Sequence, residues 1–390
     1  MKDPAHRLAS QTRDRALAPA AHGGDVEAVA RAYGVSRRDL IDFSANLNAL
    51  GPPASLLSAL AATLGDPYTL GCYPDPRAAP LRDALAVQLG IEASSIVIAN
   101  GAAALLDAAV RLRPLRRCLV PLPAFSEDQR ALAAAAVELV PLRLDPHDGF
   151  RLPVEGVARA LAAGDADAVL LTNPHNPSGA LTRRADMGIV LAAARCRGAL
   201  AIVDEAFIDF IPQESVAARA AREPDLVVVR SLTKFFAVPG LRAGYAICEP
   251  RLAARLQATL PPWPVTSFVL HAFAAALGDE GYARASRLHN ERERERCAAC
   301  FRSLGLRVTP SSANFLLLEL PRGALPASAI AAELVRHDRL VVRDCSSFAG
   351  LERGAFLRVA VRTRADNERL AAALARILYA GNAQRNANRP

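Results

Sequence analysis

Aromatic residues are scarce in this chain: they make up 5% of its 390 residues, and there is a single Trp. A hydrophobic core must therefore be built from many small contacts of Ala, Leu and Val between helices and sheet. No stretch reaches roughly 18 uncharged apolar residues, the length that a membrane-spanning helix needs, so no span is expected. The seven cysteines are odd in number and irregularly spaced, which favours a reducing, cytoplasmic setting over a disulfide framework.

The chain also lacks a strong charge of one sign. Its 47 Lys and Arg against 39 Asp and Glu leave a formal charge of +8, and no basic run is interleaved with aromatic residues. Nucleic-acid binding is therefore not expected, and an anionic substrate or cofactor is the better use of the mild positive excess. The basic N-terminus contains no apolar segment, so residues 1–21 are expected to form a disordered leader and not a secretion signal.

Short apolar runs alternate with helical patterns, and this alternation predicts an α/β fold whose mostly parallel sheet is covered by helices. The runs that predict strands are residues 95–99, 117–120, 137–144, 168–172, 199–203, 226–230 and 244–248. They define a large domain over residues 55–265. A smaller α+β domain is expected over residues 266–380, with a frayed tail at 381–390. Residues 22–54 are expected to pack with the smaller domain and the active site.

Three polar clusters follow these predicted strands. The first cluster is NPHNPSG at residues 173–179. The second is DEAF at residues 204–207, whose Asp204 ends an apolar run. The third is SLTK at residues 231–234, whose Lys234 stands eight residues before Arg242. Taken singly, they are an ordinary turn, a helix cap and a surface lysine. Because the carboxyl ends of parallel strands meet at one edge of a sheet, together they predict a ligand site at that edge.

This ordered set resembles the fold-type I pyridoxal-phosphate enzymes, the aspartate aminotransferase-like superfamily, over residues 22–379. The resemblance implies a seven-stranded large domain and pyridoxal 5′-phosphate as cofactor, with Lys234 as the catalytic residue that forms the Schiff base. Asp204 would pair with the pyridinium nitrogen, and Asn176 would donate to the ring oxygen O3′. The other cofactor-binding residues that the resemblance implies are Gly101, Ala102, Phe125, Phe207, Ser231, Thr233, Arg242 and Tyr73.

Two of these residues carry further implications. Tyr73 matches a tyrosine that reaches the cofactor phosphate from the neighbouring subunit, which implies a homodimer with shared active sites. Phe207 stands where aminotransferases usually have a tyrosine that donates to O3′. Its ring cannot donate, which is consistent with either simple drift to a packing residue or a branch that does not transaminate.

The N-terminal segment narrows the reaction. HGGD at residues 22–25, DFSANLN at 42–48 and DEAFIDFIP at 204–212 resemble L-threonine-O-3-phosphate decarboxylase of cobalamin biosynthesis. That family converts O-phospho-L-threonine to (R)-1-amino-2-propanol O-2-phosphate. The substrate-binding residues that the resemblance implies are His22, Gly23, Asn46, Asn176, Arg343 and Arg358. The register at Arg343 allows a gap of one residue.

Two other functions stay open from the sequence. Histidinol-phosphate aminotransferases carry a related SxNxNxxG segment, and a non-catalytic pyridoxal-phosphate-fold protein could serve as a partner when aminopropanol phosphate is attached to the corrinoid. No metal site is expected. The CxxC pair of Cys297 and Cys300 lies in a helical pattern of alternating charge, with no second pair at zinc spacing.

Overall fold

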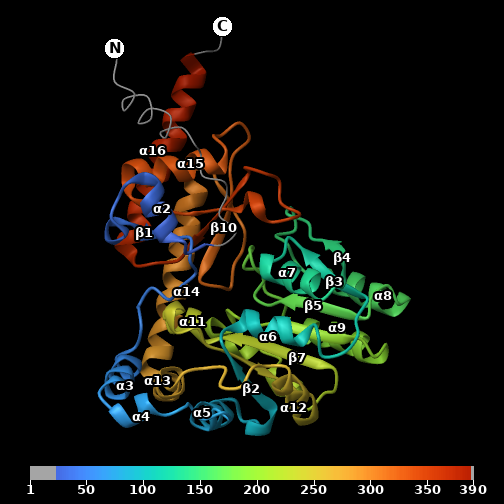
Figure 1. Ribbon diagram of the computed structural model, residues 1–390. Helices are drawn as coiled ribbons and strands as arrows, with labels where there is room; N and C mark the ends of the chain where they lie inside the picture. The colour runs from blue at the N-terminus through green and yellow to red at the C-terminus, as the bar shows by residue number, and fades with distance from the viewer. Residues whose placement is uncertain (1–22, 388–390) are drawn as a thin grey trace, which may run out of the picture.

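The structure is a computed structural model that describes residues 23–387, with side chains up to residue 379. The expected leader and the predicted site residue His22 lie outside the described residues. Two domains are joined by the long helix α14 (Glu280–Ser303), which runs from one to the other in Figure 1. The larger domain holds the main sheet, and the smaller one gathers the N- and C-terminal parts of the described chain.

The main sheet has seven strands in the order β2-β8-β7-β6-β5-β3-β4. Strand β8 is antiparallel to both of its neighbours, and the remaining pairs are parallel. The strands are β2 (Ile96–Ala99), β3 (Arg117–Leu122), β4 (Glu138–Arg143), β5 (Ala168–Thr172), β6 (Leu200–Asp204), β7 (Leu226–Ser231) and β8 (Gly244–Ile247). All seven expected strands are present, and the α/β fold is confirmed.

Both faces of this sheet are covered by helices, which explains why its strands are continuous apolar runs. In β6, Ala201 and Val203 pack on one face, and Leu200 and Ile202 on the other. The first face is covered by α3 (Ala54–Leu64), α5 (Ala79–Leu89), α8 (Val154–Ala163), α9 (Arg184–Cys196) and α13 (Ser267–Leu277). The second is covered by α6 (Ala102–Ala109), α7 (Ser126–Ala134) and α12 (Pro250–Ala258).

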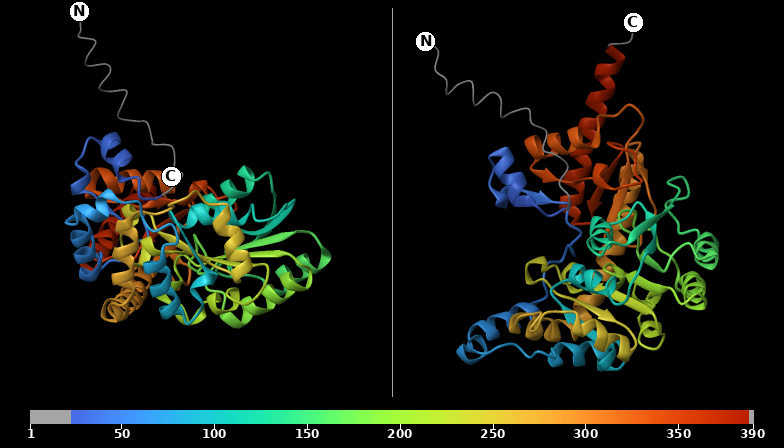
Figure 2. Two further views of the ribbon diagram at one scale, coloured as in Figure 1. Left: turned by 60° about the horizontal axis from the view of Figure 1, so that its bottom comes forward. Right: turned by 45° about the vertical axis from the view of Figure 1, so that its right-hand side comes forward.

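The smaller domain is built on an antiparallel sheet in the order β12-β13-β10-β9. Its strands are β9 (Arg307–Val308), β10 (Phe315–Glu319), β12 (Arg343–Asp344) and β13 (Phe356–Ala360), and its helices include α15 (Ala327–Glu333) and α16 (Arg364–Ala387). The N-terminal segment belongs to this domain, because β1 (Ile41–Asp42) pairs in parallel with β11 (Leu340–Val341). Figure 2 shows this blue segment beside the red C-terminal part in both views.

The structure departs from the expected boundaries in two places. Helix α13 was expected in the smaller domain, but Val269, Leu270 and Phe273 pack in the core of the large sheet. The change of domain falls within α14, since Tyr282 packs on the large core and Phe301 in the small one. At the C-terminus, α16 extends to Ala387, so residues 381–387 are helical and not the frayed tail that was expected.

Candidate active site

The predicted ligand residues meet at the carboxyl ends of β5, β6 and β7. Thr172 at the end of β5 lies opposite Asp204 at the end of β6, and Asp204 lies opposite Val229 in β7. The short helix α11 (Leu232–Phe235) begins directly after β7 and carries Lys234. The sheet register therefore brings Asp204 and Lys234 to the same edge, as the sequence predicted.

Lys234 lies in an environment that favours its neutral amine. Burial lowers the pKa of its amine to about 8, and the positive charges of Arg358 and Arg242 act in the same direction, while Asp204 opposes them. An amine must be deprotonated to attack an aldehyde, so this setting suits a nucleophilic lysine.

The reactivity of this amine should follow pH accordingly. In the cofactor-free protein, labelling of Lys234 by an amine-reactive reagent should reach half of its plateau near pH 8, because only the neutral amine reacts. Peptide mass spectrometry across a pH series measures the midpoint. Replacing Arg242 by Gln removes one repelling charge and should move the midpoint upward. A midpoint near the ordinary lysine value of 10.5 would contradict this account of the site.

Asp204 is a buried carboxyl at the end of a buried strand. Its side chain is 4% exposed, and Oδ1 accepts a hydrogen bond from the Ala206 N–H at 2.9 Å. Burial raises its pKa to about 6, against the opposing effects of the Ala206 hydrogen bond and of Lys234. A carboxylate that is costly to ionise is stabilised by a cationic partner, so a protonated ring nitrogen fits this position.

An anion cradle lies at the start of α6. Gly101, at φ 87°, is its N-cap, and a Cβ there would come within 2.8 Å of the Arg242 guanidinium. A Cβ on Gly244 would come within 2.6 Å of the Ala102 nitrogen, so these loops require glycine. Ser231, at the end of β7, lies opposite Gly244, and its hydroxyl lies 2.9 Å from the Thr233 hydroxyl. Backbone N–H groups at a helix N-terminus, hydroxyls and a guanidinium are the groups that hold a phosphate.

Two arginines face each other in the smaller domain. Arg343 in β12 lies opposite Arg358 in β13, and both side chains are buried. Arg358 donates to Asn176 Oδ1 at 2.7 Å and to the Ser44 carbonyl at 3.0 Å, and its guanidinium lies over the Phe315 ring. Its Nε has no hydrogen-bond partner among the residues that the structure describes.

Because both arginines are buried, a negatively charged ligand would stabilise them. Arg343 donates to Ser347 Oγ at 2.7 Å and lies over the Phe348 ring. Burial lowers the pKa of Arg358 to about 10, and it also lowers the pKa of Arg343. A cation that is costly to bury is stabilised by a negatively charged ligand. The contacts at Ser44, Phe315, Ser347 and Phe348 were not predicted from the sequence.

The N-terminal segment reaches this pair of arginines. A Cβ on Gly23 would overlap the Ser44 carbonyl at 2.1 Å and approach the Arg358 guanidinium to 3.4 Å. Asn46 is buried, and its Oδ1 has no hydrogen-bond partner within the described part of the chain. The predicted substrate residues Gly23, Asn176, Arg343 and Arg358 therefore lie in one region, Asn46 follows two residues after Ser44, and the role of each stays a prediction.

The three aromatic residues that were predicted to bind the cofactor lie in different surroundings. Phe125 directly precedes α7, and Phe207 is buried with its ring edge against Phe315, at 5.0 Å between centroids. Tyr73 is 79% exposed and stacks on Trp263, so in a single subunit it does not join the site.

A buried network is centred on Arg230 and on Glu205, the residue that follows Asp204. Arg230 pairs with Glu205 at 2.9 Å and donates to the hydroxyls of Ser215 and Tyr245. His175 bridges two loops through Ser178 Oγ and the Pro123 carbonyl, and burial lowers its pKa to about 4. These groups are matched to one another and hold the loops of the site in place.

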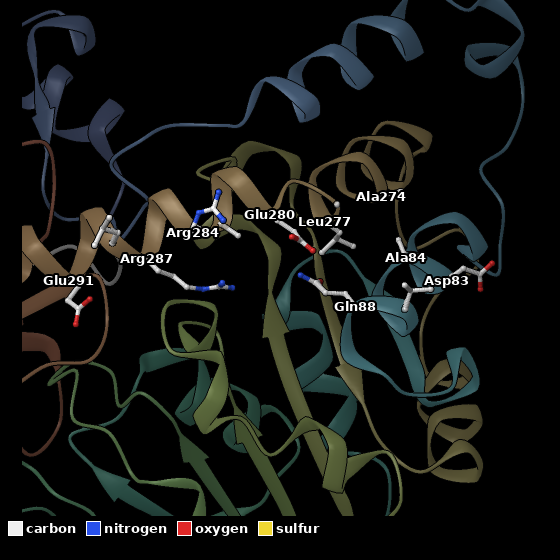
Figure 3. Close-up of a pocket in the computed structure, with 13 residues that line it drawn as sticks. Asp83, Ala84, Gln88, Ala274, Leu277, Glu280, Arg284, Arg287 and Glu291 are labelled. Atoms are coloured by element: carbon white, nitrogen blue, oxygen red, sulfur yellow. The ribbon is translucent and has the colours of Figure 1, made fainter.

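A separate cavity of about 1120 Å³ lies between α5, α13 and α14 (Figure 3). It is lined by Asp83, Gln88, Glu280, Arg284, Arg287, Glu291 and mostly apolar residues of the same helices, and none of the predicted site residues lines it. In the described range, no helix is long and apolar enough to cross a membrane. Over the same range, no group of three or more His, Cys, Asp or Glu side chains could hold a metal ion.

Comparison with known proteins identifies the family of this chain. The family model "Aminotransferase class I and II" matches residues 38–374. The chain is 36% identical over 368 residues to the threonine-phosphate decarboxylase of Salmonella typhimurium, covering 93% of this chain and 98% of that protein. It is 28% identical over 367 residues to an adenosylcobalamin biosynthesis bifunctional protein of Leptospira interrogans, covering 93% of this chain and 42% of that protein. Its fold matches the crystal structure of histidinol-phosphate aminotransferase from Clostridium acetobutylicum with a TM-score of 0.80, at 29% identity, covering 87% and 99% of the two chains.

The chain therefore belongs to the aminotransferase class I and II family, whose members are pyridoxal-phosphate-dependent enzymes. Its own residues fit that cofactor. The glycine-lined cradle beside Arg242 suits the phosphate, the buried Asp204 suits the ring nitrogen, and Lys234, whose pKa is lowered, feels the charges of both Arg242 and Asp204.

Proposed function

We propose that this protein decarboxylates O-phospho-L-threonine to (R)-1-amino-2-propanol O-2-phosphate, the aminopropanol linker of cobalamin, with pyridoxal 5′-phosphate as cofactor. The observation that carries the proposal is the pair of buried arginines, Arg343 and Arg358, which lie opposite each other, with Arg358 near enough for its charge to lower the pKa of Lys234. The substrate has two anionic ends, a carboxylate and a phosphate. Two guanidinium groups suit them, because each can donate two parallel hydrogen bonds.

Each residue then has a definite task. Arg358 binds the substrate carboxylate, supported by Asn176, and Arg343 and the N-terminal segment bind the substrate phosphate. Asp204 holds the proton on the ring nitrogen of the cofactor, which supplies an electron sink when bound. Lys234 returns a proton to the substrate carbon from which carbon dioxide has left.

Two findings favour decarboxylation over amino transfer. Phe207 has no hydroxyl to donate to the cofactor and is buried against Phe315. The relative at 36% identity is a threonine-phosphate decarboxylase, and a further relative is a protein of adenosylcobalamin biosynthesis.

The seven cysteines form no disulfide, which supports a cytoplasmic location.

A histidinol-phosphate-type aminotransferase is the alternative enzyme, supported by the structural match at 29% identity. Rates with the two substrates discriminate between these functions. We expect release of carbon dioxide from phosphothreonine without any oxo acid, and little amino transfer from histidinol phosphate to 2-oxoglutarate. The opposite pattern would support the aminotransferase. Cofactor binding without turnover of either substrate would support a non-catalytic partner in attachment of the aminopropanol phosphate.

Replacing Arg358 by Lys should weaken substrate binding. A lysine ammonium lacks the planar fork of the guanidinium, so it cannot donate hydrogen bonds to a carboxylate, Asn176 and the Ser44 carbonyl at the same time. A hydrogen bond to a charged group contributes about 1.5–3 kcal/mol. The KM for phosphothreonine should therefore rise roughly 10- to 100-fold, as measured by steady-state kinetics. Arg336→Lys, an exposed arginine of the same domain, is the matched control. An unchanged KM for the Arg358 variant would remove Arg358 from the substrate site.

We also propose a homodimer with shared active sites. A band of exposed apolar side chains lies on and beside α3 and α4 (Pro67–Gly71) in the large domain, which is unusual for a surface that faces water. Its members are Leu57, Leu64, Tyr68, Leu70, Tyr73 and Trp263. Burying this band against a second copy would bring Tyr73 toward the partner's cofactor phosphate.

A charge in this band should therefore separate the subunits. Leu64→Glu is expected to sediment as a monomer and to lose cofactor affinity, because the carboxylate would be buried against apolar surface. Ile189→Glu, a substitution of the exposed Ile189 on α9, is the control and should remain a dimer. A Leu64 variant that stays dimeric, or a wild-type chain that is monomeric, would refute the proposal.

A further inference from the structure

Asn48 is a buried polar residue of the N-terminal segment that reaches the helix of the reactive lysine. It is 6% exposed and ends the DFSANLN motif. Its backbone N–H donates to the Lys234 carbonyl at 3.0 Å, and its side-chain amide donates to the Phe235 carbonyl at 2.8 Å. One residue from a distant part of the chain therefore holds the backbone of Lys234 and of its neighbour.

The helix that carries Lys234 needs such donors. Helix α11 has only four residues, and the last four carbonyl groups of any α-helix have no partner within it. The turn after α11 also donates to the Lys234 carbonyl, from the Ala237 N–H, but at the longer distance of 3.3 Å. A helix this short is not stable by itself, so its position depends on contacts that the rest of the chain supplies.

The same side chain reaches the helix that joins the two domains. The Asn48 amide nitrogen also lies 2.8 Å from Ser286 Oγ and 3.0 Å from the Tyr282 hydroxyl, both on α14. The Tyr282 hydroxyl lies 2.9 Å from the Phe235 carbonyl, which closes the network. Ser286 is fully buried and stands between Tyr282, which packs on the large core, and Phe301, which packs in the small one. Asn48 therefore links α11 to α14 where the chain passes from one domain to the other.

The amine of Lys234 depends on the position of its backbone. Burial and the charges of Arg358 and Arg242 lower its pKa to about 8, and Asp204 acts in the opposite direction. Asp204 ends β6, Arg358 lies in β13 and Arg242 precedes β8, so three separate parts of the chain create this environment. The amine keeps it only while α11 stays in place, and movement toward water would return the pKa toward 10.5.

We propose that Asn48 is a positioning residue, which fixes the backbone of Lys234 and ties it to α14. The inference rests on Lys234 as the reactive amine of the proposed function. Asn48 acts through the carbonyl groups of α11 and not on the reacting atoms. Loss of its side chain should let α11 shift, and a misplacement of about 1 Å can cost about 100-fold in rate.

Labelling of Lys234 in the cofactor-free protein tests this role without any turnover. In Asn48→Ala the midpoint of labelling should rise from near pH 8 toward 10.5, because the amine is no longer held in its buried place. Ser286→Ala breaks only the connection to α14 and should give a smaller rise. The double variant should match Asn48→Ala, since both substitutions break one connection. In the holoenzyme, kcat of Asn48→Ala should fall about 10-fold at a nearly unchanged KM.

Asn367→Ala is the matched control, because Asn367 is also 6% exposed and donates to Glu293 and to the Arg362 carbonyl within the smaller domain. It should lower the unfolding temperature about as much as Asn48→Ala does, and leave the Lys234 midpoint and kcat unchanged.

Three results would overturn the proposal. One is an Asn48→Ala variant that is less stable but keeps its midpoint near pH 8, since Asn48 would then have a structural role alone. The others are an unchanged midpoint in Ser286→Ala, which stays informative if Asn48→Ala does not fold, and additive shifts in the double variant. The labelling uses cofactor-free protein, so failure of the proposed decarboxylation would leave its outcome unaffected.

Discussion

Replacing Lys234 by Ala is expected to lower turnover of phosphothreonine by about four orders of magnitude, the upper range for a group that moves a proton in the rate-determining step. The variant loses the amine that holds the cofactor and the group that returns a proton to the substrate carbon. The environment of Lys234 supports this assignment, because burial lowers the pKa of its amine to about 8. Steady-state release of carbon dioxide measures the loss.

The composition of the chain makes this test unusually clear. Its only lysines are Lys2 and Lys234, so reduction of the holoenzyme with borohydride should fix the cofactor to one peptide, the one that contains Lys234. Lys2→Ala is the matched control and should retain both label and turnover. A small external amine should restore part of the activity of Lys234→Ala, which it would not do for a misfolded variant. Label on another peptide would contradict the assignment.

Replacing Asp204 by Asn should reduce kcat roughly 10²- to 10³-fold, the cost of removing one preorganised electrostatic group from an active site. The amide can still accept the hydrogen bond from the Ala206 N–H, so the fold is retained while the negative charge is lost. The ring nitrogen then has no anion to hold its proton. Steady-state kinetics with saturating cofactor measures the effect, and Asp107→Asn, on α6 and paired with Arg130, is the control.

The same substitution should leave stability unchanged or improve it. Burial raises the folded-state pKa of Asp204 to about 6, above its ordinary value of 3.8. The unfolded chain therefore releases this proton first as pH rises, and the group contributes a penalty to folding that is fully present above pH 6. Asn removes that penalty, so the cofactor-free variant should unfold at the same or a higher temperature at pH 7. A strongly destabilised variant would mean that Asp204 has a structural role.

The sequence predicted the large sheet well because its strands are buried on both faces. Runs such as residues 226–229 are continuously apolar, as expected for strands between two helical layers. The two-residue strands β1 and β9 were not predicted, since nothing local distinguishes them and their pairing with remote strands creates them. Helix α13 was assigned to the wrong domain for the same reason: its apolar residues do not reveal which core they join.

Some residues of the candidate site could likewise be predicted from the sequence, and others could not. Lys234, Asp204 and Arg242 could be predicted because strand ends and motif order place them together. Phe315, Phe348 and Ser347 could not, because their contacts with the two arginines depend on how the smaller domain folds. Asn48 looks like an ordinary residue of a polar turn, and only the folding of the N-terminal segment against α11 and α14 buries it.

The most direct test of the central claim follows the substrate carboxyl carbon. The holoenzyme is incubated with phosphothreonine labelled with ¹³C at that carbon, without any oxo acid, and both products are followed by NMR. We predict many equivalents of labelled carbon dioxide per subunit and an aminopropanol phosphate that keeps its nitrogen. Label that stays in the amino acid, or turnover that begins only when 2-oxoglutarate is added and transfers nitrogen to it, would contradict the account.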